Sequence, residues 1–202
     1  MSNSPLAKIK AATAAEICAN FDLKKEARPL LLDGMSPRKF LEALVAKKQF
    51  IAGIDFLSHA LPPREAIWWG CLCLQHACAN ELSEADKEAC KAAVRWILQP
   101  TEENRAAART PAETAGPASA AGHLAFAAHH TGGNIAPPKA PPVAPGPFAP
   151  AKAVANAVKL ASTKAEPAKI AETQRLFLGL GMGVSEGRFD PAEVRNRTAV
   201  QS

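Results

Sequence analysis

The sequence predicts an all-α protein built as a compact array of antiparallel helix pairs, and three observations lead to this fold class. Alanine and leucine, both strong helix formers, dominate the hydrophobic 48% of the 202 residues. Valine, isoleucine and threonine never gather into the alternating runs typical of a half-buried strand. Apolar residues instead recur three and four positions apart, as on one face of a helix. A superhelical stacking of the pairs stays open, although no exact internal repeat is visible.

The first helices precede residue 62. An alanine-rich helix is expected over residues 5–20. The next begins at Ser36 as N-cap, with Pro37 in the first helical position, where the missing N–H of proline costs no hydrogen bond. Its apolar face consists of Phe40, Leu41, Leu44 and Val45. The same spacing predicts a further helix, whose apolar face consists of Phe50, Ile54, Leu57 and Leu61.

Residues 63–80 are expected to form the central helix of the core. Pro62 and Pro63 end the preceding helix and open this one, because proline is tolerated only in the first turn. The segment that follows is apolar on every side and holds Trp68 and Trp69, two of the three tryptophans. A helix without a polar stripe has to be surrounded by other helices.

Cap signals mark the helices that follow. Ser83 precedes Asp86 at the spacing of a capping box, and Thr101 precedes acidic residues that favour the positive end of a helix dipole. Another helix is expected after Gly116. It should end at residues 132–133, both glycine, which accept the left-handed conformation of a C-terminal cap.

Residues 134–150 contain seven prolines, which forbid a helix and favour an extended strap or linker. This strap either docks on the main helical domain of residues 1–133 or projects as a ligand for another domain. Two helices are expected over residues 151–186, packing back on that domain, and residues 187–202 are expected to be a flexible tail. The glycines expected to break the last helix are Gly181, Gly183 and Gly187.

The formal charge of +5 is unevenly distributed. Residues 1–50 carry +4 (nine basic, five acidic), residues 51–133 carry −3 (six basic, nine acidic), and residues 134–202 carry +4 (nine basic, five acidic). A nucleic-acid-binding protein concentrates basic residues on one element and adds exposed aromatic residues. Here the tryptophans lie in the acidic middle, so no nucleic-acid partner is expected.

Five cysteines, an odd number, lie mostly within predicted helices, which fits reduced, buried thiols better than disulfides. The N-terminal residues lack the apolar segment of a signal peptide. No stretch is long and apolar enough to cross a bilayer. These observations predict a cytoplasmic location without membrane insertion.

Cysteine and histidine at close spacing can bind zinc, and residues 71–78 hold such a group, namely Cys71, Cys73, His76 and Cys78. A helix turns by about 100° per residue, so Cys71 and Cys73 point in opposite directions and cannot share one ion. Cys73 and His76 share one face of the helix, as do Cys71 and Cys78, but each of these pairs would need further metal ligands from elsewhere in the chain. Buried structural cysteine is the preferred interpretation, and no metal or other cofactor is expected.

His123 and His130 lie seven residues apart, two helical turns, and therefore share a face; His129 lies between them in sequence. Such a pair is able to bind a metal or act as a general base, but no carboxylate or nucleophile accompanies it in sequence. Capping of the last helical carbonyls by histidine is the preferred structural interpretation. If exposed, His123 and His130 are candidates for contact with a partner.

Arg64, Trp68 and Trp69 are further candidates for partner binding, since arginine and tryptophan are enriched at binding hot spots. The structural alternative pairs Arg64 with a carboxylate such as Asp55 and assigns Glu65 to the helix N-terminus. Because consecutive helical residues point about 100° apart, one tryptophan is expected in the core and the other at a groove.

The run LPPREAIWWGC at residues 61–71 resembles the signature of an uncharacterised bacterial all-helical family, in which LPxREA leads into two tryptophans and a cysteine. The resemblance covers residues 30–185; Pro63 and Gly70 depart mildly from the pattern. Its other matching segments are residues 104–107, 131–138 and 153–158. Members are sometimes encoded near type VI secretion genes, so the resemblance implies a cytoplasmic accessory role there. It carries over no catalytic residue.

Three functions remain open. The preferred hypothesis is a non-enzymatic adaptor, chaperone or scaffold for a secretion apparatus or its cargo. The second is an immunity-like or regulatory protein that binds a toxin. The third is an enzyme that uses His123, His130 or Cys73, which lack orienting partners in sequence. The sequence does not determine the oligomeric state.

Overall fold

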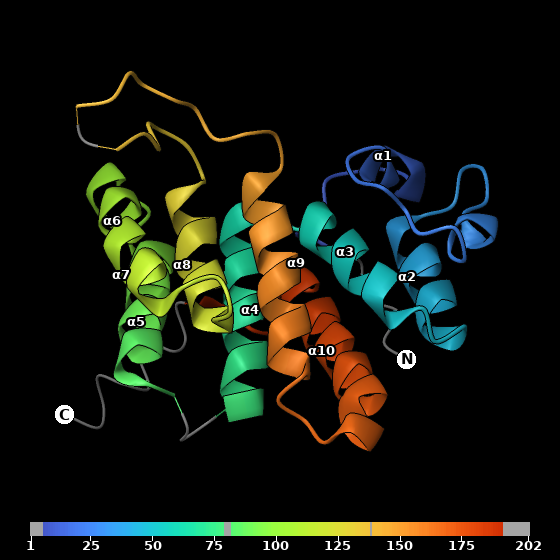
Figure 1. Cartoon of the computed structure of the whole chain (residues 1–202). Helices are drawn as coiled ribbons and strands as arrows, with labels where there is room; N and C mark the ends of the chain where they lie inside the picture. The colour runs from blue at the N-terminus through green and yellow to red at the C-terminus, as the bar shows by residue number, and fades with distance from the viewer. Residues whose placement is uncertain (1–5, 79–81, 138, 192–202) are drawn as a thin grey trace.

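The computed structural model describes residues 6–78, 82–137 and 139–191, and over these residues it is all-helical, without a strand (Figure 1). This confirms the predicted fold class. The helices are α1 (Ala14–Cys18), α2 (Pro37–Ala46), α3 (Phe50–Ala60), α4 (Pro63–Cys78), α5 (Glu84–Leu98), α6 (Glu102–Ala107), α7 (Arg109–Ala115), α8 (Ala120–His129), α9 (Ala149–Ser162) and α10 (Ile170–Ser185). Two short 3₁₀ turns, Arg28–Leu30 and Pro167–Lys169, precede α2 and α10.

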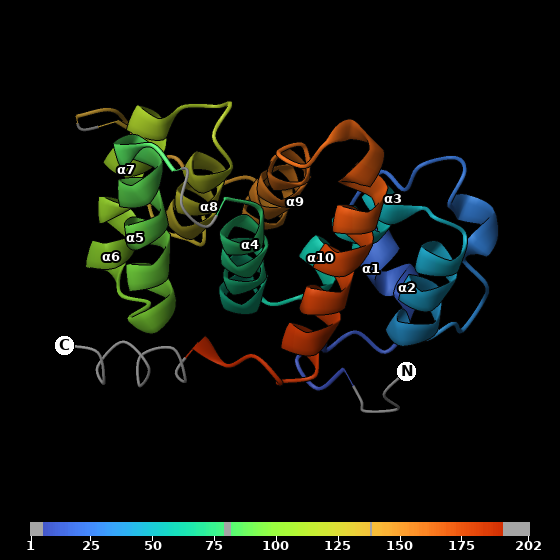
Figure 2. The ribbon, with the colours of Figure 1, turned by 90° about the horizontal axis from the view of Figure 1, so that it is seen from below.

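Helix α4 lies in the middle of the molecule and packs against α5, α8, α9 and α10 (Figures 1 and 2). Helix α3 joins this group through α9 and α10, and α1 and α2 cover α3 at the N-terminal end. Ile67, Trp69 and Cys73 of α4 are fully buried. The central position predicted for this helix is therefore confirmed; its predicted end near residue 80 lies outside the described residues.

Three helices begin at the predicted caps. The side-chain oxygens of Ser36, Ser83 and Thr101 each accept a hydrogen bond from a backbone N–H three residues later, at the start of α2, α5 and α6. These bonds satisfy donors that a helix N-terminus would otherwise leave unpaired. Local sequence alone therefore determines where these helices start.

The first helix is shorter than predicted. Thr13 caps it by accepting the N–H of Glu16, and the backbone N–H of Ala14 is bonded to the carbonyl of Met35. Residues 6–13 form no helix, and the backbone N–H of Lys8 is bonded to the carbonyl of Ser185 at the end of α10. Pro5, the predicted first residue, lies outside the described residues.

The prediction that glycines break the last helix is wrong for two of them, because α10 runs through Gly181 and Gly183 to Ser185. A Cβ at Gly181 would lie 2.3 Å from Cδ2 of Leu57, and one at Gly183 would lie 2.3 Å from the ring of Phe189. These glycines permit close packing. Only Gly187, with φ 79°, follows the helix in the left-handed conformation.

The strap is shorter than predicted because α9 begins at Ala149, with Pro150 in its first turn, where proline is tolerated. Among its described residues, 134–137 and 139–148 form no helix, and in Figure 1 they arch above the ends of α6 and α8 before the chain enters α9. Of the predicted tail, residues 187–191 fold back against the body, since Phe189 accepts a hydrogen bond from Trp68. Residues 192–202 lie outside the described residues.

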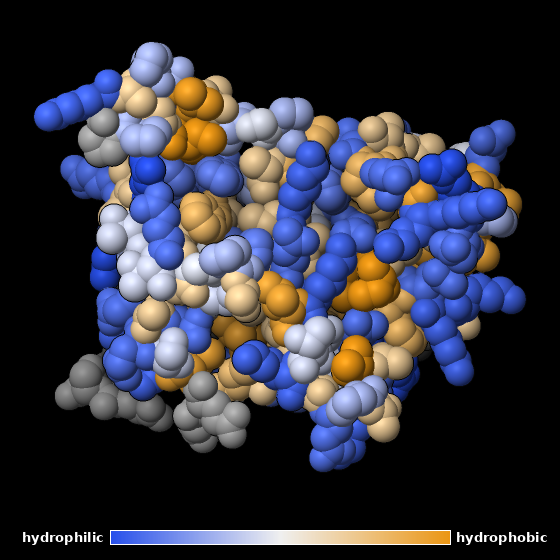
Figure 3. Space-filling model, viewed as in Figure 1, coloured by the Kyte–Doolittle hydropathy of each residue, from blue (hydrophilic) through white to orange (hydrophobic). Residues whose placement is uncertain are grey.

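The face of the molecule drawn in Figure 3 is largely hydrophilic, with apolar side chains in small separate groups. The large apolar side chains exposed among the described residues are Leu32, Val143, Phe148, Leu176 and Phe189. None of the described helices is long and apolar enough to span a membrane.

Candidate functional site

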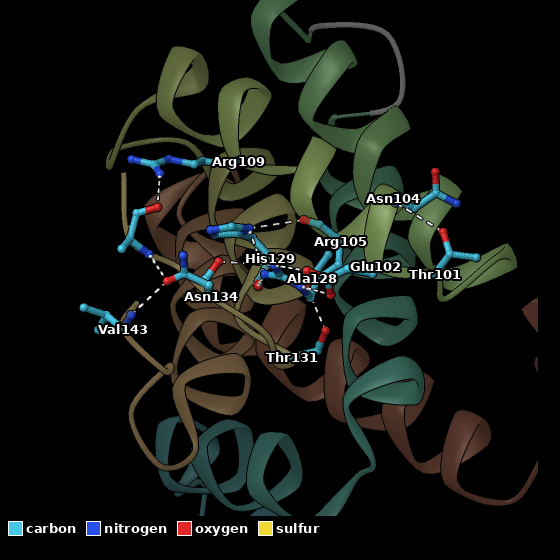
Figure 4. Close-up of polar contacts among 11 residues, drawn as sticks. Thr101, Glu102, Asn104, Arg105, Arg109, Ala128, His129, Thr131, Asn134 and Val143 are labelled. Atoms are coloured by element: carbon cyan, nitrogen blue, oxygen red, sulfur yellow. Dashed lines mark hydrogen bonds and ion pairs between the residues drawn. The ribbon is translucent and has the colours of Figure 1, made fainter. Parts of the chain in front are cut away.

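A buried cation, Arg105 of α6, holds the start of the strap (Figure 4). Its Nε and Nη2 donate to the two carboxylate oxygens of Glu102 at 2.7 and 2.6 Å. Its Nη1 donates to the carbonyl of His129 at 2.5 Å, and Nη2 donates to the carbonyl of Asn134 at 3.2 Å. One guanidinium therefore joins α6, the end of α8 and the strap, as the planar fork of arginine allows.

Two residues close off this cation from solvent. His129 is 4% exposed, and its Nδ1 lies 3.2 Å from both Nη1 and the backbone oxygen of Arg105. Burial lowers the pKa of His129, and it outweighs the opposite effect of the hydrogen bond to the backbone carbonyl of Arg105. Gly133, with φ 64°, brings its Cα so close that a Cβ there would lie 2.7 Å from Nη2 of Arg105.

Asn134 closes the strap into a loop. Its Oδ1 accepts the backbone N–H groups of Ala136 and Val143 at 2.9 and 2.8 Å, and Arg109 donates to the carbonyl of Ala136 at 3.0 Å. We call Arg105, Arg109, His129 and Asn134 the strap clamp. Their polar atoms hold backbone groups, so the clamp fixes the loop above it.

An apolar pocket of about 250 Å³ lies between α4 and α5. It opens to solvent, and its walls are formed almost entirely by carbon and sulfur atoms. The described residues that line it are Trp68, Cys71, Leu74, Gln75, Cys78, Leu82, Cys90 and Val94. We call it the α4–α5 pocket.

Residues 40–185 of the chain match the model of a family of unknown function, DUF6931. The chain belongs to DUF6931. No curated protein and no solved structure matches it. This match confirms the prediction that the chain belongs to an uncharacterised family. The matched span of DUF6931 includes both the strap clamp and the α4–α5 pocket.

The two adjacent tryptophans of this DUF6931 chain have different surroundings. Trp69 is fully buried, and its Nε1 donates to the carbonyl of Phe177 at 2.7 Å. Trp68 is 6% exposed, donates to the carbonyl of Phe189 at 3.1 Å and lines the α4–α5 pocket. One indole therefore belongs to the core and the other forms a pocket wall.

The expected pairing of Arg64 with Asp55 is wrong. The Nε of Arg64 donates to the carbonyl of Ile97 at 2.7 Å, which satisfies the C-terminal end of α5. Asp55 is paired instead with Lys159 of α9. Arg64 is half-buried and is not a freely exposed recognition group.

The predicted histidine pair does not cap α8. His123 has its Nε2 3.0 Å from the carbonyl of Pro117, and His130 lies with its ring 5.7 Å from that of Phe126. The terminal carbonyls of α8 are satisfied by Arg105 and by Thr131, so the histidine-cap interpretation is wrong. Sequence reasoning missed Arg105 and His129; the only local signal was Glu102 three residues before Arg105.

The five cysteines of the DUF6931 chain, all of them among the described residues, form no disulfide. Burial raises the pKa of Cys73 and Cys71, and it raises the pKa of Cys90 to about 11. Within the described residues, no three histidine, cysteine, aspartate or glutamate side chains lie together as a possible metal site. Protonated thiols behave as small hydrophobic groups, which matches the apolar character of the α4–α5 pocket.

Proposed function

We propose that this chain is a non-enzymatic protein-interaction module, an adaptor, chaperone or scaffold that serves a bacterial secretion system of the type VI kind. The interaction role rests on one observation, the α4–α5 pocket. It is open and apolar, and one of its walls is the indole of Trp68, which donates a hydrogen bond to the carbonyl of Phe189. Pockets of this character receive the anchor residues that contribute most of the binding energy at protein interfaces.

The size of the pocket favours a side chain over a small-molecule ligand. Its volume of about 250 Å³ falls below the ~300–1,000 Å³ typical of small-molecule sites. It also lacks the converging polar groups that orient a cofactor, since Gln75 is the one amide among its described lining residues. The occupant we propose is a leucine, methionine or phenylalanine side chain of a protein partner.

The strap clamp supports the same interpretation. Arg105 and Asn134 use their polar atoms on backbone carbonyl and N–H groups of the chain itself. A clamp of this kind positions a loop, and loops held on a rigid scaffold commonly carry recognition.

The secretion role and the cytoplasmic location are supported by the resemblance of residues 61–71 to the helical family encoded near type VI secretion genes. Deletion of the gene tests this part. Loss of type VI secretion with normal growth agrees with an accessory role. Normal secretion, or self-poisoning of the deletion strain, contradicts it.

The pocket is tested by filling it. Val94 of α5 is half-buried at the pocket wall, so V94F places a phenyl ring in the proposed binding site. Leu176 of α10 is 40% exposed and does not line the pocket, so L176F is a control that introduces the same phenyl side chain away from the pocket. We expect tagged V94F to lose a partner that wild type and L176F both retain from cells. Equal retention by V94F contradicts the pocket as the binding site.

A further inference from the structure

We propose that the described strap residues 139–147 are a preformed polyproline ligand for a partner protein with an aromatic-lined groove and an acidic group at one end of it. This surface is distinct from the α4–α5 pocket. The two sites together would allow the chain to join two partners.

The sequence of this segment is KAPPVAPGP. Proline fixes its own φ near −65° and drives the preceding residue to extended conformations, so Pro141, Pro142 and Pro145 bias most of the segment towards polyproline II. That helix has three residues per turn. Pro142 and Pro145 are spaced by three and therefore share one side of it, whereas Lys139, with φ 70°, lies in the turn just before this stretch.

The spacing also produces two X-Pro pairs, Pro141-Pro142 and Ala144-Pro145, three residues apart. Grooves that recognise Pro-rich segments bind such pairs between aromatic side chains. Lys139 lies two residues before the first pair and, being an exposed cation, fits an acidic group at the groove's end. The segment therefore carries both the apolar and the charged part of a recognisable ligand.

The segment is available for binding. Residues 139–144 are exposed, and Val143 exposes 51% of its surface. Figure 1 shows the strap at the edge of the molecule, above the helix ends.

The segment is also held in place at its middle and by the residue that follows it. At the middle, the backbone N–H of Val143 is bonded to Asn134, and the carbonyl of Val143 accepts the N–H of Ile135 at 2.9 Å. Directly after the segment, Phe148, with φ 57°, places its ring 5.9 Å from that of His59. Restraint of a ligand before binding reduces the entropy lost on association.

The test uses the full chain as bait in cells and compares P142A/P145A with P167A. Pro167 is an exposed proline near the start of α10, remote in sequence from the strap. A synthetic peptide of residues 139–147 serves as competitor. We expect a protein captured by wild type and P167A to be depleted at least tenfold by the double substitution and by the peptide. The tryptophan fluorescence of the captured protein should change when that protein binds the peptide.

Three outcomes would overturn the proposal: identical captured proteins for P142A/P145A and wild type, no competition by the peptide, or no fluorescence change on peptide binding. The V94F variant separates this surface from the pocket, because it should still capture the strap's partner. Circular dichroism and thermal unfolding of P142A/P145A check that the helices are intact, as expected for substitutions at exposed loop residues.

Discussion

Gly181 of α10 lies directly on the indole of Trp69 in α4, so closely that a Cβ at residue 181 would be 2.8 Å from Cε2 of the ring. The same Cβ would be 2.3 Å from Cδ2 of Leu57. Both neighbours are fully buried and have no room to move. The approach of α10 to the centre of the molecule therefore depends on the absence of a side chain at this position.

G181A should destabilise the chain by about 1–3 kcal/mol, the usual cost of forcing extra volume into a packed core. Gly179, in the same helix, has open space where a Cβ would be. G179A should therefore be neutral or stabilise by up to ~1 kcal/mol through its higher helix propensity. Urea denaturation of both variants checks this. Equal effects of the two substitutions would contradict the close packing.

R105A should lower the free energy of unfolding by about 2–4 kcal/mol, because it leaves the buried carbonyl of His129, and the carbonyl of Asn134, without their donor. R105K should recover only part of this loss, since an ammonium cannot reproduce the fork geometry. R28A removes an exposed arginine paired with exposed Asp22 and should stay within about 0.5 kcal/mol of wild type. Chemical denaturation that finds R105A as stable as R28A would show that the clamp does not hold the strap.

Some of these features follow from sequence and others do not. The caps at Ser36 and Ser83 were predictable because the capping side chain and the N–H it accepts are three residues apart. The packing of Gly181 was not, because its neighbour Trp69 is 112 positions away along the printed chain and α10 reaches it only through the tertiary fold. Closely spaced glycines predict the end of a helix when only the sequence is known. Their role in close packing becomes visible only when the side chains that face them are known.

The candidate site, like the fold, was predictable from the sequence only in part. The importance of Trp68 and of the proline-rich strap was visible in composition. His129 was passed over in favour of His123 and His130, because its partner Arg105 lies 24 residues earlier and no periodicity connects them. The α4–α5 pocket is lined by residues of two helices. It could not be predicted, because the sequence does not determine which faces of these helices point toward each other.

Stability should fall as the pH is lowered from 7 to 5. Burial lowers the pKa of His59, His129 and His130 below the ordinary value of 6.5. The unfolded chain therefore takes up protons before the folded chain does, so the stability present above about pH 6.5 is lost as the pH falls through the lowered values. Urea midpoints at several pH values measure this decrease.

H59F should make that decrease shallower. His59 stacks on Phe21 at 4.8 Å, and its buried Nε2 has no hydrogen-bond partner, so a phenyl ring suits the site. The charged groups acting on it are Asp55, Lys152 and Lys159. A pH profile of H59F that matched wild type would mean that His59 contributes nothing to the acid sensitivity.

Thiol labelling of the folded chain should be slow at pH 8 and should accelerate about tenfold per pH unit, because the thiolate is the reactive form and burial raises the pKa of Cys90 to about 11. Half-buried Cys90 at the pocket wall should react before fully buried Cys73. Mass spectrometry of labelled peptides identifies the order. Rapid labelling of Cys73 in the folded state would contradict the burial of α4.

The most direct test of the central claim is the dissociation constant of the captured partner for wild type, V94F and L176F, measured by calorimetry on purified proteins. If the α4–α5 pocket receives an apolar anchor residue, V94F should bind at least tenfold more weakly than wild type, a loss of about 1.4 kcal/mol or more, while L176F stays within about twofold. An unchanged dissociation constant for a folded V94F would contradict the account.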